Sequence, residues 1–143
     1  MTNEQINLVQ MSFATIEPNA EATSAIFYNR LFEIDPSLRG LFKGDLGEQG
    51  RKLMQMIGLV VKSLGRIEEI VPAIRSFGAR HAGYGVDDRH YQTVGEALLW
   101  TLKQGMGSAF TNDVKDAWAA AYGLLSQVMK EASAPAAEHA TAV

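Results

Sequence analysis

The chain has 143 residues and a mass of 15.6 kDa, which is the size of a single domain with one core. Hydrophobic residues make up 47% and charged residues 20%, a composition typical of folded globular proteins. The formal net charge of -3 and the isoelectric point near 5.6 provide no basic field for phosphates. We therefore expect no nucleic-acid partner and no electrostatic attachment to a membrane.

Several chemistries lack the residues that they require. The chain has no cysteine, which excludes disulfides, thiolate nucleophiles, iron–sulfur clusters and cysteine zinc sites. The dinucleotide fingerprint GxGxxG, the P-loop GK[ST] and the metalloprotease motif HExxH are also missing. The N-terminal segment has neither the basic start nor the apolar run of a signal peptide, and no stretch reaches membrane-spanning length, so we expect a cytoplasmic protein.

Apolar residues recur at spacings of three and four along nearly the whole chain, which predicts an all-α fold. A first helix is expected up to about Glu17, because Thr2 and Gln5 have the spacing of a capping box at its start and Pro18 follows its end. A second helix is expected over residues 19–34.

A short third helix is predicted after the second. Asp35 and Pro36 are the residue types typical of an N-cap and a first helical position, and the segment cannot run past Phe42. Residues 43–50, rich in glycine and charge, are expected to form either a loop or the frayed start of a helix over about 49–64.

Three more helices are expected in the second half of the chain. Their predicted ranges are about 68–83, which ends at a pair of glycines, about 87–104, and a last helix capped by Thr111 or Asn112. Residues 133–143 are alanine-rich and have no apolar stripe, so we expect a mobile tail after a single domain over 1–132.

The three histidines differ in their surroundings. His139 lies in the predicted tail and His90 precedes an apolar stripe by one position, so both are expected at the surface. His81 follows Phe77 by four residues, so both project from the same side of one helix. Spacing alone leaves two interpretations of His81 open, a histidine with its polar atoms satisfied in the core or a ligand.

Three separated motifs resemble those of globins, specifically bacterial single-domain globins similar to the haem domain of flavohaemoglobins and to neuroglobin. FYNRLFEIDPSLRGLF, residues 27–42, is similar to the second and third helices of the family, with Phe42 at the haem-stacking phenylalanine. FGARHAGYGVDDRHYQTVGEALL, residues 77–99, resembles the proximal segment, with the iron-binding histidine at His81. DAWAAAYGLLSQVM, residues 116–129, resembles the final helix, and together the motifs imply a globin fold around a haem b pocket.

The resemblance also implies which residues hold the haem. His81 becomes the axial ligand, because an imidazole in this position holds the iron and sets its electronic properties. The remaining haem contacts expected from apolar side chains are Phe42, Leu53, Met56, Phe77, Val86 and Val94.

On the opposite, distal side, the resemblance implies two hydrogen-bond donors to dioxygen, Tyr28 and Gln49. Gln49 precedes Leu53 by four residues, so both project to one side, whereas a helix shifted by one residue would present Glu48 or Gly50 instead. An isolated tyrosine on an apolar stripe would more often only fill space, but within a globin Tyr28 is expected to donate. A hydrogen bond to a charged acceptor contributes about 1.5 to 3 kcal/mol.

Three further residues have weaker links to the haem. Lys52 either reaches a haem propionate or is an ordinary solvated lysine, and Tyr84 has a similar place beside His81. Tyr91 matches a flavohaemoglobin tyrosine of the proximal side, where a glutamate of the last helix also contributes. In this chain only Glu131 lies near the position of that glutamate. A main-chain carbonyl is the alternative acceptor for the hydrogen bond that orients the His81 imidazole.

The resemblance implies reversible binding of dioxygen, nitric oxide and carbon monoxide at a five-coordinate ferrous iron. Resemblance to flavohaemoglobins further implies conversion of nitric oxide to nitrate. Those proteins carry a reductase domain, for which this chain has no room, so we expect an external reductase. The alternatives are oxygen storage or delivery, gas or redox sensing, and a helical interaction module without a cofactor; we expect a monomer or weak dimer.

Overall fold

The computed structural model describes the backbone of residues 1–42, 44–83 and 88–142, and the side chains of residues 1–42, 44–76, 78–79 and 89–131. Its α-helices are α1 (Asn3–Ile16), α2 (Ala20–Ile34), α3 (Leu46–Lys62), α4 (Val71–Gly83), α5 (Asp88–Met106) and α6 (Asn112–Ala142). Short 3-10 helices are η1 (Glu17–Asn19), η2 (Pro36–Leu41), η3 (Leu64–Glu69) and η4 (Gly107–Ala109). The described backbone contains no strand, so the predicted all-α class is confirmed.

Local hydrogen bonds form the predicted helix starts. The Thr2 hydroxyl accepts from the Gln5 amide at 3.1 Å, and the Gln5 side chain accepts from the Thr2 amide at 2.9 Å, which completes the capping box. The Asp35 carboxylate accepts from the Ser37 amide at 3.1 Å at the start of η2, which ends before Phe42. Both starts agree with the prediction because the partners are only two or three residues apart.

Helix α3 begins earlier than the expected residue 49. The Asp45 carboxylate accepts from the Gly47 amide at 3.0 Å and caps the helix, so residues 46–50 are helical rather than a loop. The helix ends at Lys62, and η3 occupies the following residues up to Glu69.

The last helix begins as predicted and extends beyond the expected domain end. The Thr111 hydroxyl accepts from the Val114 amide at 3.2 Å, which selects Thr111 from the two capping candidates. The backbone is helical to Ala142. The mobility of residues 133–143 and the domain boundary at 132 remain predictions.

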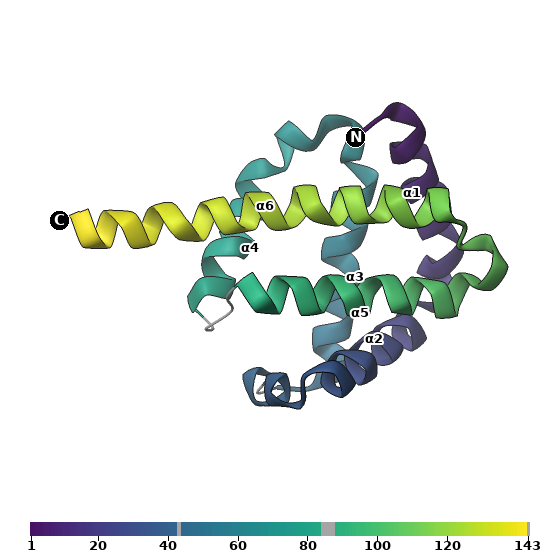
Figure 1. The fold of residues 1–143 in the computed structure, drawn as a ribbon, viewed down its shortest axis with the longest axis horizontal. Helices are drawn as coiled ribbons and strands as arrows, with labels where there is room; N and C mark the ends of the chain where they lie inside the picture. Colours follow the sequence, from purple (N-terminus) through teal and green to yellow (C-terminus); the bar gives the residue numbers. More distant parts are fainter. Residues whose placement is uncertain (43, 84–87, 143) are drawn as a thin grey trace.

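The helices pack in two crossed layers (Figure 1). Helices α5 and α6 run antiparallel, joined through η4, and α3 crosses them. Helix α6 packs against α4 and α1, while α2 packs against α5 and α3. In the described part of the chain, none of the helices has the length and apolar character of a membrane span.

Two clusters of buried apolar side chains make up the core. The larger joins α1, α3, α5 and α6, with Val9, Phe13 and Trp118 among its buried members. The smaller lies between α2, η2 and α5, and its buried members are Phe27, Tyr28, Leu31, Leu38 and Ala97. Leu53 of α3 and Leu98 of α5 pack against both clusters and so connect them.

Candidate functional site

Tyr28 is buried among aromatic rings in the smaller cluster. Only 5% of it is exposed, and its ring centroid lies 5.2 Å from that of Phe27, 6.1 Å from that of Phe32 and 5.3 Å from that of Phe42. Burial raises the pKa of its phenol to about 12, so the group is a neutral donor at ordinary pH. Its hydroxyl makes no hydrogen bond to another described residue, and its oxygen is not among the fully buried atoms that lack a partner, so a small molecule can reach it. This donor therefore remains available within an apolar environment.

Phe42 is held at the end of η2 by its neighbours. The Arg39 guanidinium donates to the Phe42 carbonyl at 3.2 Å and lies 5.6 Å from the centre of the Phe32 ring. The Phe42 ring packs edge-on against Phe32 and Tyr28, with the Phe32 centroid 5.6 Å away. The predicted haem-stacking phenylalanine and the predicted donor are thus in direct contact.

The first turn of α3 lies against the same tyrosine. A methyl group placed on Gly50 would lie 2.5 Å from the Ser24 hydroxyl oxygen and 3.7 Å from the Tyr28 ring, so only glycine permits this approach of α3 to α2. Gly50 therefore faces α2, and Glu48 pairs with Lys52 at the surface. Gln49 is exposed on this turn, and its side-chain amide makes no hydrogen bond to a described residue.

Apolar side chains beside Tyr28 are only partly buried although they pack against the core. Phe42, Leu53, Val94 and Leu98 border the smaller cluster in this way, and Met56 borders the larger one. Such a surface suits a flat apolar group. Among the described residues, no group of three or more histidine, aspartate or glutamate side chains could hold a metal ion.

Lys52 is exposed at the start of α3. Its ammonium lies 3.9 Å from the Glu48 carboxylate, and both side chains are more than half exposed, so the pair is an ordinary i,i+4 surface pair. Its predicted contact with a haem propionate remains a prediction.

The residues expected on the proximal side mostly lie outside the described side chains. These are Phe77, His81, Tyr84 and Val86. The backbone of His81 belongs to α4, which packs against α6. Their roles at a haem remain predictions.

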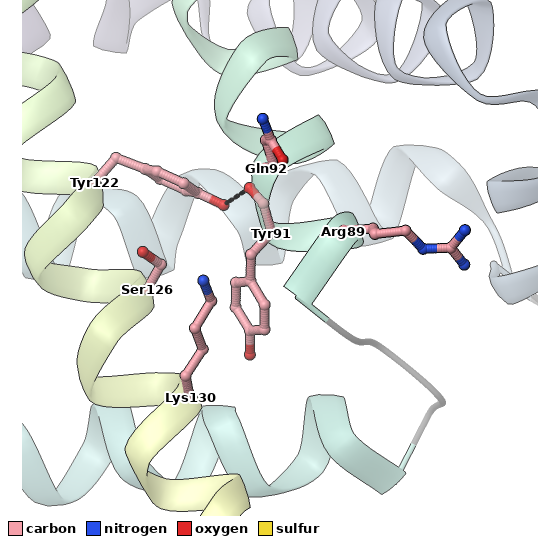
Figure 2. Close-up of a pocket in the computed structure, with 6 residues that line it drawn as sticks. All are labelled: Arg89, Tyr91, Gln92, Tyr122, Ser126 and Lys130. Atoms are coloured by element: carbon pink, nitrogen blue, oxygen red, sulfur yellow. Dashed lines mark hydrogen bonds between the residues drawn. The ribbon is translucent and has the colours of Figure 1, made fainter.

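Tyr91 borders a cleft of about 360 Å³ between α5 and α6 (Figure 2). The Tyr122 hydroxyl donates to the Tyr91 carbonyl at 2.5 Å, and burial raises the pKa of Tyr122 well above its ordinary value. The Lys130 side chain runs beside the Tyr91 ring, with its ammonium nitrogen 5.5 Å from the ring centre. Glu131 is exposed and accepts from the Gln127 amide at 3.0 Å. Helix α6 thus presents a cation to the Tyr91 ring.

Sequence reasoning did not identify the close helix contacts around the site. Gly50 approaches Ser24, Gly78 approaches Met129, and Gly95 lies against the Tyr122 ring. A glycine inside a predicted helix is a signal of such an approach, because it otherwise weakens the helix. The partner of each glycine, however, depends on the tertiary packing.

Comparisons with known proteins agree with this arrangement. A family model described as globin matches residues 25–129. The chain is 31% identical over 131 residues to a flavohemoprotein of Vibrio cholerae, a match that covers 90% of this chain but 33% of that protein. The chain thus spans about a third of the flavohemoproteins that it matches. It is 34% identical over 143 residues to leghemoglobin 3 of Sesbania rostrata, covering 92% of this chain and 97% of that one.

Two solved structures share the fold over almost their whole lengths. A bacterial globin from Campylobacter jejuni has a TM-score of 0.86 at 24% identity, covering 96% of this chain and 99% of the other. An engineered carbene transferase, made from a candidate nitric oxide dioxygenase of Rhodothermus marinus, has a TM-score of 0.89 at 27% identity, covering 99% of both chains.

Proposed function

Because this chain belongs to the globin family, whose members hold haem and bind diatomic gases, we propose that it carries haem b with His81 as the residue that would hold the iron, and that it binds dioxygen, nitric oxide and carbon monoxide reversibly. The observation that carries the proposal is the Tyr28 hydroxyl, a protonated donor buried among aromatic rings and free of any hydrogen bond to the described residues. Its oxygen is not fully buried, so a bound gas molecule can reach this hydroxyl and accept a hydrogen bond from it.

The described residues would have distinct roles around the haem. Phe42, Leu53 and Val94 contribute apolar contacts, because their side chains border the Tyr28 cluster and are only partly buried. Tyr28 donates to a polar gas molecule on the distal side. Gln49 supplies a second donor from the turn that packs against Tyr28, since its exposed amide is not engaged with described residues.

We propose dioxygenation of nitric oxide as the reaction. Nitric oxide, dioxygen and one electron combine to give nitrate, with two new nitrogen–oxygen bonds formed as the dioxygen bond breaks. When bound, the haem iron supplies the gas-binding position and the one-electron redox change. The protein's own residues orient and hold the polar gas through Tyr28 and Gln49 and exclude water through the aromatic cluster. A reductase outside residues 1–143 returns the electron.

A second candidate is reversible oxygen binding without turnover, as storage, delivery or sensing. The 34% identity to leghemoglobin 3 over 92% of this chain supports it. We propose a cytoplasmic monomer or weak dimer in either case.

Two experiments test these proposals in sequence. Replacement of His81 by glycine should abolish tight haem retention, and added imidazole should partly restore the Soret spectrum. Unchanged retention would show that His81 is not the ligand. His90→Ala is the control and should leave the spectrum unaltered.

Stopped-flow mixing of the oxygenated ferrous protein with nitric oxide should then yield ferric protein and one nitrate per haem. If no nitrate forms, the second candidate is the better description.

A further inference from the structure

Helix α4 lies directly on the main chain of α6 at Gly78. A methyl group placed on Gly78 would overlap the Met129 carbonyl oxygen and lie 2.6 Å from the Met129 Cα and 2.9 Å from its carbonyl carbon. A side chain could rotate away from such a contact, but main-chain atoms inside a helix cannot. The separation of α4 and α6 is therefore limited by the absence of a side chain at this one position.

The contact lies less than one turn before His81 on the same helix. Three residues correspond to a rise of about 4.5 Å along the axis, so Gly78 and His81 move together if α4 shifts as a rigid body. Among the described glycines, Gly78 alone has main-chain atoms of a neighbouring helix as its nearest contacts. Gly50 meets the Ser24 side chain and Gly95 the Tyr122 ring.

We propose that Gly78 is a positioning residue for the haem ligand: its contact with Met129 sets how far α4, and with it His81, stands from α6. The inference rests on the proposed function, in which His81 holds the iron. A methyl group at position 78 would push α4 away from α6 and change the position of the imidazole.

This role predicts an effect distinct from that of the distal donors. With haem bound, a change in the position of the His81 imidazole would alter the affinity of the iron for every gas, so oxygen and carbon monoxide release should shift together. Loss of a distal hydrogen bond chiefly affects oxygen, because the carbon monoxide ligand is a poor acceptor.

The test is Gly78→Ala, compared with two matched glycine variants. Gly95→Ala, on α5, also introduces a close contact, because its methyl group would lie 2.8 Å from the Tyr122 ring. Gly123→Ala, at an exposed position of α6, introduces no contact within 4 Å. The readouts are the iron–histidine stretching band of the ferrous protein, the rate of haem loss to an acceptor globin, and hydrogen exchange of the α4 amides in the haem-free protein.

Gly78→Ala alone should shift the stretching band, speed haem loss about tenfold and raise exchange along α4. An unshifted band with unchanged haem loss would overturn the proposal, as would an equal band shift in Gly95→Ala, which would indicate general packing damage. If Gly78→Ala folds poorly, the same readouts are taken in a Gly78→Ala/Gly123→Ala double variant, since alanine at exposed position 123 strengthens α6.

The cavity variant His81→Gly with imidazole separates this inference from the proposed function. In this variant the imidazole that binds the iron is not covalently attached to α4, so Gly78→Ala should no longer shift the iron–imidazole band. A persisting shift would contradict transmission through His81. If His81→Gly retains haem fully, the proposed function fails, and exchange of the α4 amides still reports whether Gly78 sets the packing of α4.

Discussion

At the scale of single residues, Tyr28 decides the chemical character of the site. Its ring belongs to an aromatic cluster with Phe27, Phe32 and Phe42, while its hydroxyl has no partner among the described residues. A side chain that only filled space would not require this hydroxyl. The two roles can be separated because phenylalanine keeps the ring and removes only the oxygen.

Tyr28→Phe should speed oxygen dissociation about ten- to a hundredfold if Tyr28 donates to the gas. A hydrogen bond to a charged acceptor contributes about 1.5 to 3 kcal/mol, and 1.4 kcal/mol corresponds to a factor of ten. The measurement is the oxygen off-rate by stopped-flow displacement. Carbon monoxide release is the internal control and should change far less; equal shifts for the two gases would indicate a loosened pocket instead.

Gln49→Leu should act in the same direction with a smaller change, because Gln49 is exposed at the edge of the site. If Tyr28 and Gln49 donate to the same gas molecule, the effect of the double variant on oxygen dissociation should differ from the sum of the two single effects. The difference, expressed as free energy, should exceed the deviation of about 0.5 kcal/mol that independent sites show. Strict additivity in the oxygen off-rates would argue against a shared ligand.

The pKa of Tyr28 predicts how stability depends on alkaline pH. Burial raises this pKa to about 12 from its ordinary value of 10.0, so the folded state holds the proton more tightly than the unfolded state. The stabilising contribution of the protonated Tyr28 phenol to the free energy of unfolding is fully present below about pH 10 and is lost as pH rises towards 12. Urea unfolding at a series of pH values should therefore show a steeper decline for the wild type than for Tyr28→Phe. Parallel curves would show that the phenol is not held neutral by burial.

At the scale of elements, α1 and α6 are joined by one buried hydrogen bond. The Trp118 indole N–H donates to the Ser12 hydroxyl at 2.8 Å, and the Ser12 hydroxyl in turn donates to the Leu8 carbonyl at 2.6 Å. Trp118 is only 3% exposed, so water does not readily replace the serine. This contact fixes the two helices that begin and end the described core.

Ser12→Ala should lower the free energy of unfolding by about 1 to 3 kcal/mol, because it leaves the buried indole N–H without an acceptor. Urea titration followed by tryptophan fluorescence measures this as a lower midpoint with an unchanged slope. Thr15→Ala is the matched control in the same helix, since its exposed hydroxyl donates only to the Ser12 carbonyl at 2.7 Å. A similar loss in both variants would mean that helix propensity, not the contact with Trp118, determines the effect.

At the scale of the whole molecule, two core clusters meet at Leu53 and Leu98 beside partly buried apolar side chains. A haem bound there would cover apolar surface that the protein alone leaves partly exposed, which favours the folded state. The stability of the domain should consequently depend on the cofactor.

Haem titrated into the haem-free protein should raise the melting temperature in a concentration-dependent manner. A ligand at a thousand times its dissociation constant stabilises the folded state by about 4 kcal/mol. Differential scanning calorimetry measures the shift, and His81→Gly should reduce it. A melting temperature indifferent to haem would contradict a haem site in this domain and favour a cofactor-free helical module.

The amino-acid sequence by itself determined the all-α class and the starts of α1 and η2, because apolar periodicity and caps depend on residues within a few positions of one another. The capping box at Thr2 and the Asp35 cap are examples. Through a resemblance of motifs it also predicted that Tyr28 and Phe42 serve one haem pocket, whereas the contact between their rings is a finding of the tertiary structure. Only the tertiary structure decided that α3 presents Gly50 to Ser24 and that α6 brings Lys130 to the Tyr91 ring. Such contacts join residues far apart in the chain, and their geometry follows from how whole helices cross.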